Sequence, residues 1–200
     1  MNFTKKEYWD NIYSSEKQEM DWYSTFSKIY PKIKHCFIDK SMKILQIGCG
    51  TSNFAKKLYQ KGFSEITNID ISETAIEKMK KKYQNLSIKF EIMDTRNLTF
   101  KDESFDCIID KGTLDSLLTE YPKENSLKML SEIYRIMKPN SIFIEITWGT
   151  PFDRMFYLKN KKFKWKISHK IISCEKEEEK FTFYIYFLRK GKENEETKKG

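Results

Sequence analysis

The sequence contains no long apolar run. None approaches the roughly 18–20 residues that are needed to cross a bilayer, and no apolar segment near residue 1 resembles a signal peptide. We therefore expect no membrane partner. Histidine occurs twice and cysteine four times, and no two cysteines form a Cys-x-x-Cys pair. The sequence therefore predicts no metal site, and the scattered thiols favour a reducing, cytoplasmic location.

Arginine is also scarce, although the chain is basic. The formal net charge is +8, yet only four of the 37 basic residues are arginine. Sites that read base sequence favour arginine, because its planar fork binds and stacks on bases. The lysine runs at 78–82 and 159–164 are interleaved with apolar residues, which is typical of solvated faces. We therefore do not expect a nucleic acid partner, although a basic surface attracts acidic molecules.

The most informative segment that is present is an apolar run that ends in two glycines. Residues 43–47 are followed directly by Gly48-Cys49-Gly50. Glycine permits the positive φ of a sharp turn, and its missing Cβ lets a ligand approach the backbone. Asp70 follows Gly50 by twenty positions, a spacing at which a carboxylate accepts hydrogen bonds from ribose hydroxyls. The pattern predicts a nucleoside site, although a Gly-x-Gly alone also occurs in turns that bind nothing.

The residues after the two glycines narrow the class of nucleoside. A dinucleotide fingerprint needs a third glycine where this chain has Asn53, and no Gly-Lys-Ser/Thr follows as in a phosphate loop. The start of the next helix is therefore polar and less suited to a diphosphate. These features favour S-adenosyl-L-methionine over a nicotinamide cofactor or ATP.

Apolar periodicity predicts alternating strands and helices in one domain. Strands are expected at 42–47, 65–70, 87–93, 105–110 and 141–147, and helices at 4–14, 24–37, 53–61, 73–83 and 123–138. Ser72 is a suitable N-cap for the helix at 73–83, and Pro139-Asn140 is expected to end the last helix. This alternation predicts a parallel sheet with helices on both faces.

The end of the chain departs from this alternation. Two strand-like runs, 163–173 and 180–189, are joined by six residues, too few for a crossover between parallel strands. They must therefore be antiparallel. The run 181–188 is apolar on both faces, which predicts insertion within the sheet, and an ordinary terminal hairpin is the alternative. Residues 191–200 are charged and are expected to be a disordered tail.

Taken together, these motifs resemble class I S-adenosylmethionine-dependent methyltransferases, and more specifically the lysine methyltransferases of eukaryotic elongation factor 1-alpha. The matching segments are Tyr8-Trp9-Asp10 with Tyr13, Asp21-Trp22-Tyr23, Gly48-Cys49-Gly50-x-Ser52, Asn68-Ile69-Asp70-Ile71-Ser72, Met93-Asp94, Ser104-Phe105-Asp106, Asp110-Lys111-Gly112-Thr113-Leu114-Asp115 and Pro151-x-x-Arg154. The resemblance implies a Rossmann-like α/β fold with a seven-stranded sheet, parallel except for one antiparallel strand from the C-terminal hairpin. A single domain would span 1–190, with 1–38 as a helical cap over the cofactor site.

The resemblance also implies a set of residues that bind the cofactor. They are Trp9, Tyr13, Trp22, Gly48, Gly50, Asp70, Ile71, Met93, Asp94, Thr95 and Lys111. Asp70 would bind the ribose hydroxyls and Ile71 would pack on the adenine. Asp94 would accept the adenine amino proton, with a turn aspartate as the alternative. Lys111 would hold the cofactor's carboxylate, or pair with Asp110 or Asp115.

The resemblance also implies a joint role for three aromatic residues near the start of the chain. Trp9, Tyr13 and Trp22 would fold over the cofactor as a lid that excludes water and presents π faces to the sulfonium. The alternative is that they only pin a terminal helix to the core.

The implied reaction is methylation of a lysine side chain in a protein such as elongation factor 1-alpha. A catalytic base is not assigned; Asp115 and Glu145 are better candidates than His35 or His169, which lie outside the predicted strand ends. The alternatives are an RNA or small-molecule methyltransferase, or a cofactor-binding module without catalysis. The Asn-Pro-Pro-Tyr motif of adenine methylation is missing, and Asp110-Lys111-Gly112-Thr113 stands in its place. The oligomeric state stays open, with a monomer favoured.

Overall fold

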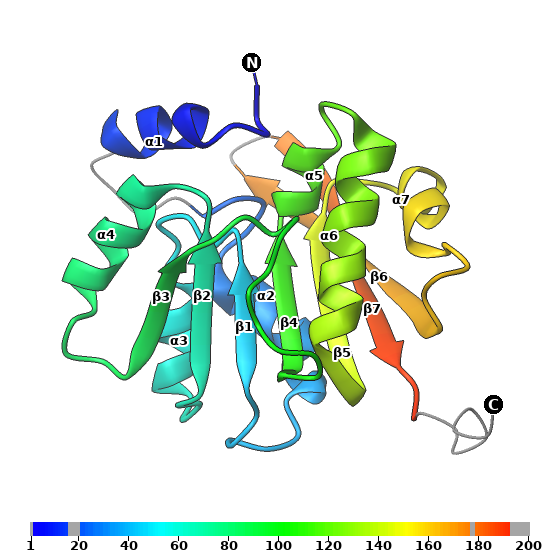
Figure 1. Cartoon of the computed structure of the whole chain (residues 1–200), viewed down its shortest axis with the longest axis horizontal. Coiled ribbons are helices and arrows are strands. Elements are labelled where there is room, and N and C mark those ends of the chain that lie inside the picture. The colour runs from blue at the N-terminus through cyan, green and yellow to red at the C-terminus, as the bar shows by residue number, and fades with distance from the viewer. Residues whose placement is uncertain (1, 16–20, 177–178, 193–200) are drawn as a thin grey trace.

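Six parallel strands and one antiparallel strand form a single mixed sheet (Figure 1). The computed structural model describes residues 2–15, 21–176 and 179–192, and within them the strand order is β3-β2-β1-β4-β5-β7-β6. The strands are β1 (Ile44–Ile47), β2 (Ile66–Asp70), β3 (Ile88–Ile92), β4 (Phe105–Lys111), β5 (Met137–Thr147), β6 (Trp165–Lys176) and β7 (Glu179–Lys190). This confirms the fold class that the sequence predicts.

Helices cover both faces of the sheet because the strands are apolar on both sides. The helices are α1 (Lys6–Ser15), α2 (Phe26–Ile33), α3 (Phe54–Gln60), α4 (Glu73–Lys82), α5 (Thr113–Leu117), α6 (Pro122–Ile136) and α7 (Pro151–Leu158), with a 3₁₀ turn at Lys34–Cys36. In Figure 1, α6 lies in front of the sheet, whereas α2 and α3 lie behind it. Ile44 and Leu45 are adjacent on β1 and fully buried, yet they join the two different core clusters.

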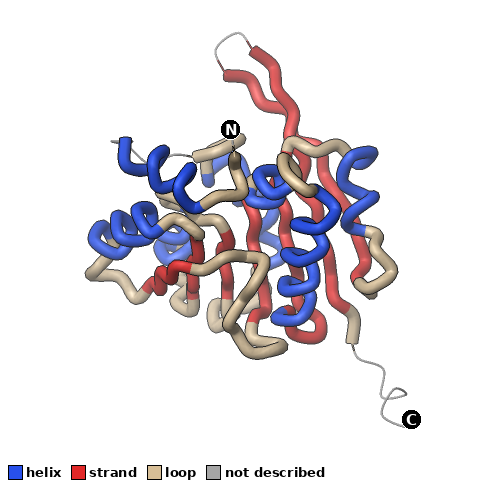
Figure 2. Tube along the Cα trace, turned by 45° about the horizontal axis from the view of Figure 1, so that its top comes forward, coloured by secondary structure: helices blue, strands red, loops and turns tan. Residues whose placement is uncertain are grey.

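The C-terminal hairpin completes the sheet as the sequence predicts. Strand β7 pairs antiparallel with β5 on one side and β6 on the other, so it lies inside the sheet and β6 forms the edge. Its alternate side chains enter opposite cores: Phe183 and Ile185 pack in one cluster, and Tyr186 and Leu188 in the other. Figure 2 shows the hairpin extending beyond the other strands. Most of the predicted tail, 193–200, lies outside the described residues.

The junction between α6 and β5 differs from the prediction. Helix α6, which the sequence predicted at 123–138, ends at Ile136, and β5 begins at once, so Pro139 and Asn140 lie in a strand and do not stop the helix. The pairing with β4 shifts register between Phe105 and Cys107, and Asn140 has a φ of 62°. Proline is tolerated at such an irregularity because it has no ladder hydrogen bond to donate there. The short helices α5 and α7 were not predicted.

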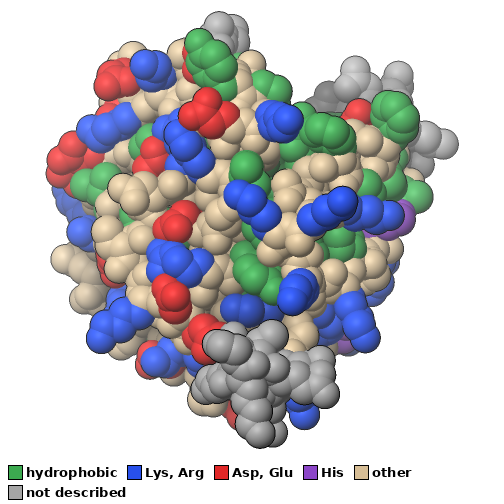
Figure 3. All heavy atoms as spheres, turned by 45° about the vertical axis from the view of Figure 1, so that its right-hand side comes forward, with side chains coloured by type: hydrophobic (Ala, Val, Ile, Leu, Met, Phe, Trp, Pro, Cys, Tyr) green, Lys and Arg blue, Asp and Glu red, His purple; other side chains and the backbone are tan. Residues whose placement is uncertain are grey.

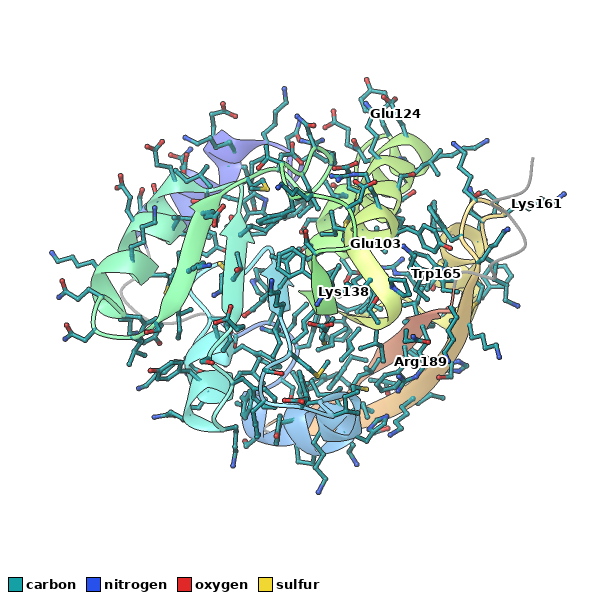
Figure 4. All side chains as sticks on the ribbon, turned by 60° about the horizontal axis from the view of Figure 1, so that its bottom comes forward. Glu103, Glu124, Lys138, Lys161, Trp165 and Arg189 are labelled. Atoms are coloured by element: carbon teal, nitrogen blue, oxygen red, sulfur yellow. The ribbon has the colours of Figure 1, made fainter. Side chains whose placement is uncertain are left out.

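The burial of the cysteines and the exposure of the lysines both agree with the composition. All four cysteines are free and buried, as expected of small hydrophobic side chains. Figure 3 shows Lys and Arg side chains spread over one face, and the lysines of the 159–164 run are exposed. Figure 4 brings the amino-terminal ends of the parallel strands forward, where Lys138 is ion-paired with Asp106 at 2.8 Å. Among the described residues, no helix is long and apolar enough to span a bilayer.

Candidate active site

The turn after β1 has the backbone conformation that its glycines predict. Gly48 and Gly50 have φ angles of 53° and 50°, in the left-handed region. A Cβ on Gly48 would collide with the side chain of Thr113, and a Cβ on Gly50 would collide with the hydroxyl of Tyr13. The close approach at Gly50 is therefore made by the protein's own lid residue. Both positions require glycine for conformation and for space.

A cavity of about 260 Å³ lies at the carboxyl ends of the parallel strands, where ligands bind in such sheets. Of the eleven predicted cofactor-binding residues, Gly50 is absent from its lining, because Tyr13 covers it. The ten that line the cavity are Trp9, Tyr13, Trp22, Gly48, Asp70, Ile71, Met93, Asp94, Thr95 and Lys111. The lining includes the exposed Trp22 and Trp148 and the buried Asp70 and Lys111, so the cavity leads from the surface to the sheet.

Asp70 is held at the end of β2 by two backbone groups. Its Oδ2 accepts a hydrogen bond from the Gly50 amide at 2.7 Å, and its Oδ1 accepts one from Ser72 at 2.8 Å. Burial raises the pKa of this carboxyl to about 6, and the backbone hydrogen bonds only partly oppose that effect. Each carboxylate oxygen has a second lone pair, so Asp70 can still accept hydrogen bonds from two hydroxyls. The site therefore fits the ribose of an adenosyl group.

Asp94 also lies at the cavity, but it has an internal partner. Arg96 donates from Nε to both carboxylate oxygens at 2.9 and 3.0 Å and from Nη2 to Oδ2 at 2.6 Å. The amide of Arg96 donates to Asp94 Oδ1 at 2.9 Å, which is the turn arrangement given as the alternative. Arg96 also contacts the carbonyl of Thr4 in the N-terminal segment at 3.3 Å. The sequence interpretation missed Arg96, although it is one of only four arginines.

The three predicted lid residues come together above the cavity. The Trp9 and Tyr13 rings stack with centroids 5.9 Å apart, and Trp22 meets Trp9 edge-on at 6.3 Å. The Trp9 indole donates to the carbonyl of Phe3 at 2.8 Å. Tyr13 is buried and packs α1 onto the glycine turn, whereas Trp22 is 42% exposed. The same group of rings therefore packs the N-terminal segment onto the glycine turn and lines the cavity, while its role as a lid stays a prediction.

Lys111 does not pair with Asp110 or Asp115, the two partners proposed from the sequence. Its Nζ lies 3.3 Å from Asp21 Oδ1 and 3.3 Å from the carbonyl of Trp22. Burial lowers the pKa of Lys111, and the nearby Asp21 opposes that shift. Asp110 instead accepts the amides of Thr113 and Leu114 at 2.8 and 3.0 Å. Lys111, at the end of β4, therefore binds the segment that carries Asp21 and Trp22, which we call the lid segment (residues 21–24).

A second group of polar residues lies at the Trp148 end of the cavity. The hydroxyl of Tyr23 donates to Asp115 Oδ2 at 2.6 Å. The other oxygen of Asp115 accepts from Thr147 Oγ1 at 2.8 Å and from Arg154 Nη2. Of these residues, only Tyr23 and Asp115 line the cavity. The sequence interpretation gave Tyr23 and Arg154 no role, although both lie in the motifs that carry the resemblance.

The candidate bases differ in their access to the cavity. Glu145 is completely buried, does not line the cavity, and lies 3.2 Å from Arg154 Nε. Burial raises the pKa of Glu145 well above its ordinary value, because Arg154 only partly compensates for the lost water. Asp115 reaches the cavity, but its carboxylate already accepts three hydrogen bonds. Neither His35 nor His169 lines the cavity.

Comparison with known proteins identifies the family of this chain. Residues 38–197 match the family described as a methyltransferase domain. The EEF1A lysine methyltransferase 4 of Mus musculus is 27% identical over 202 residues, which cover 95% of this chain and 77% of that protein. The eEF1A lysine and N-terminal methyltransferase of Homo sapiens is 34% identical over 152 residues, or 72% of this chain. The match spans only 22% of the human protein.

Solved structures share the fold at low sequence identity. The N-methyltransferase NodS from Bradyrhizobium japonicum, in complex with S-adenosyl-L-homocysteine, has a TM-score of 0.70 at 14% identity. The match covers 94% of this chain and 99% of NodS. A SAM-dependent methyltransferase from Methanosarcina mazei has a TM-score of 0.68 at 19% identity, and the match covers 80% and 98% of the two chains. The chain therefore belongs to the methyltransferase domain family, as a class I S-adenosylmethionine-dependent enzyme that resembles the eEF1A lysine methyltransferases.

Proposed function

We propose that this protein transfers the methyl group of S-adenosylmethionine to a lysine side chain of another protein, with translation elongation factor 1-alpha as the first candidate. The observation that carries the proposal is the shape of the cavity. It joins a buried carboxylate, Asp70, to an aromatic mouth at Tyr23 and the half-exposed Trp148. Such a mouth suits a side chain that reaches in from a protein surface. The names of the curated relatives support the same substrate.

The residues that would hold the cofactor follow from the geometry. Asp70 would accept both ribose hydroxyls, and Ile71 and Met93 would pack against the adenine. The backbone at Gly48 would pass beneath the methionine portion, and the lid rings would exclude water from it. When bound, the cofactor supplies an electrophilic methyl group on a positive sulfur. Asp94 would receive the adenine amino group only by sharing its carboxylate with Arg96, whose amide, Nε and Nη2 already donate to both oxygens.

The acceptor lysine must lose its proton before it can attack. A free lysine has a pKa near ~10.4, so its neutral form at pH 7 costs roughly 4–5 kcal/mol. Tyr23 and Trp148 form apolar walls at the mouth, with centroids 5.3 Å apart, and removal of water lowers an amine's pKa. Alignment of the reacting atoms reduces the barrier further, by roughly 7 kcal/mol or more in ideal cases. A dedicated base is therefore unnecessary in this proposal.

The test is methyl transfer to a defined protein. Purified enzyme is incubated with S-adenosylmethionine carrying a tritiated methyl group and recombinant elongation factor 1-alpha, and labelled peptides are located by mass spectrometry. We expect methylated lysine, lost when Asp70→Ala removes the ribose carboxylate. A parallel incubation replaces the recombinant factor with a cell extract. Label that is released by nuclease but not by protease would indicate an RNA substrate. Label in the small-molecule fraction would indicate a metabolite, and cofactor binding without any transfer would indicate a binding module.

The substrate also suggests where and how the enzyme works. An enzyme of this specificity would act in the cytoplasm, where elongation factor 1-alpha functions, and the four buried free thiols suit a reducing compartment. A monomer is the expected state, which size-exclusion chromatography with light scattering would measure directly.

A further inference from the structure

We infer that Tyr23 orients the acceptor amine by accepting a hydrogen bond from it, because the phenol's own proton is directed to Asp115. The inference rests on the proposed methyl transfer to an amine and assigns the residue that selects and aligns that amine. It concerns the end of the cavity away from Asp70.

The direction of the Tyr23 hydrogen bond follows from its partner. Tyr23 donates to Asp115 Oδ2 at 2.6 Å, and a carboxylate can only accept. Burial, reinforced by the charge of Asp115, raises the pKa of Tyr23 far above its usual range, so the phenol keeps its proton. The oxygen of Tyr23 therefore offers only lone pairs to the cavity that the residue lines. It can bind an N–H or O–H group, and it repels a carboxylate or carbonyl oxygen.

The surrounding contacts fix Asp115 in this role. Thr147 Oγ1 accepts hydrogen bonds from Arg154 at 2.9 and 3.1 Å and from the Gly149 amide at 3.0 Å. Its own proton is therefore directed to Asp115 Oδ1, 2.8 Å away. Arg154 also donates to that oxygen and can never accept. Because every donor around Asp115 Oδ1 is fixed, only Oδ2 is available to Tyr23.

The arrangement draws on four separate parts of the chain. Tyr23 comes from the lid segment, Asp115 from α5, Thr147 from β5 and Arg154 from α7. The Trp148 ring stands edge-on to Tyr23 at an interplanar angle of 78° and is 49% exposed, so it forms the outer wall of the mouth. An amine that donates one N–H to Tyr23 directs its lone pair away from the phenol. A group held by so many elements is suited to positioning rather than to exchanging protons.

Substitution Asp115→Asn reverses the polarity of this hydrogen bond with almost no change in shape. Arg154 and Thr147 require an acceptor, so the amide oxygen of the new side chain faces them. The amide NH₂ then faces Tyr23, which must accept, and the phenolic proton turns toward the cavity. The variant therefore keeps every ring and replaces an acceptor of N–H groups with a donor.

The experiment compares two analogues of S-adenosylmethionine in which nitrogen replaces sulfur. One carries an alkyl chain that ends in a primary amine, and the other carries the same chain ending in a methyl group. We expect the wild type to bind the amine analogue about tenfold more tightly in calorimetry, as one charged hydrogen bond implies. Asp115→Asn and Tyr23→Phe should each reduce this preference to within about twofold, and the double variant should add nothing. Affinity for S-adenosylhomocysteine should stay within about threefold.

Methyl transfer to elongation factor 1-alpha provides the second readout. We expect kcat to fall on the order of 10- to 100-fold in both variants, whereas Asp106→Asn, which alters an ion-paired aspartate at the far end of the sheet, should leave it unchanged. An amine preference that persists in Asp115→Asn, or that the wild type lacks, would overturn the inference. If Asp115→Asn fails to fold, Tyr23→Phe provides the same test. A wild type that prefers the amine analogue but does not methylate the factor would refute the proposed substrate while supporting the role of Tyr23.

Discussion

The burial of Asp70 predicts that cofactor affinity depends on pH. With a pKa of about 6 in the unliganded protein, only about one-tenth of the molecules carry the ionised carboxylate at pH 5, against nearly all at pH 7.5. If the ribose hydroxyls require the ionised form, the apparent Kd for S-adenosylhomocysteine equals the intrinsic Kd divided by the fraction of molecules in which Asp70 is ionised. We therefore expect affinity to rise about tenfold from pH 5 to pH 7.5, or about 1.4 kcal/mol, and to level off above pH 7.

Isothermal titration calorimetry at pH 5, 6, 7 and 7.5 measures this dependence directly. Asp70→Asn should remove the pH dependence and weaken binding at pH 7.5 on the order of a hundredfold, since two hydrogen bonds to a charged group become weaker. Asp110 has a similarly raised pKa but does not line the cavity, so Asp110→Asn should keep the slope. A flat affinity between pH 5 and 7.5 in the wild type, or an unchanged slope in Asp70→Asn, would refute the reasoning.

Three further predictions concern stability and the lid. The folded pKa of Asp70 lies above its ordinary 3.8, so its protonated form favours folding. Urea titrations should show that the stability difference between the wild type and Asp70→Asn falls by roughly 3 kcal/mol as pH rises from about 4 to 6, because the other titrating carboxyls are common to both proteins. A difference that grows across that window would contradict this sign. Gly50→Ala should lower the free energy of unfolding by about 1–2 kcal/mol because of the positive φ at this position, and further because the new Cβ collides with the Tyr13 hydroxyl. The double variant with Tyr13→Phe should recover part of this loss, measured by thermal denaturation. Lys111→Met should remove the contacts to Asp21 and Trp22, so amide hydrogen exchange in residues 21–24 should accelerate, while exchange in β1 should not change. Unchanged exchange in residues 21–24 of the variant would rule out a stabilising contact between Lys111 and this segment.

Much of the fold could be predicted because local patterns and chain geometry agree. The buried run before Gly48 became β1, and Ser72 caps α4 by accepting from the Ala75 amide at 3.1 Å, as its position before Glu73 predicts. The place of β7 followed from a run that is apolar on both faces. The end of α6 could not be predicted in the same way, because Met137 and Lys138 fit either a helix or a strand. The pairing of Met137 with Phe105 of β4 favours the strand, and that contact is distant in the sequence.

A site residue could be predicted where a particular residue type, at a particular distance from a motif, is needed for binding the cofactor. Gly48 and Asp70 are of this kind, and both line the cavity. The partners of charged residues were not, because a charge can pair with any opposite charge that the fold brings near. Lys111 pairs with Asp21, ninety residues earlier in the chain, instead of a neighbouring aspartate. The same reason explains why Arg154 was missed, because its partner Asp115 is distant in the sequence, whereas Arg96 pairs with Asp94 only two residues away.

The position of β7 also bears on how the protein is made. This strand is synthesised after both β5 and β6, yet it lies between them in the sheet. While the nascent chain lacks it, the long edge of β5 and the apolar side chains of both faces have no neighbour there, which invites association with other unfinished chains. Premature termination ahead of Phe183 would leave that state permanent, so a product that lacks β7 should be cleared by proteolysis and should not accumulate as a weakened enzyme.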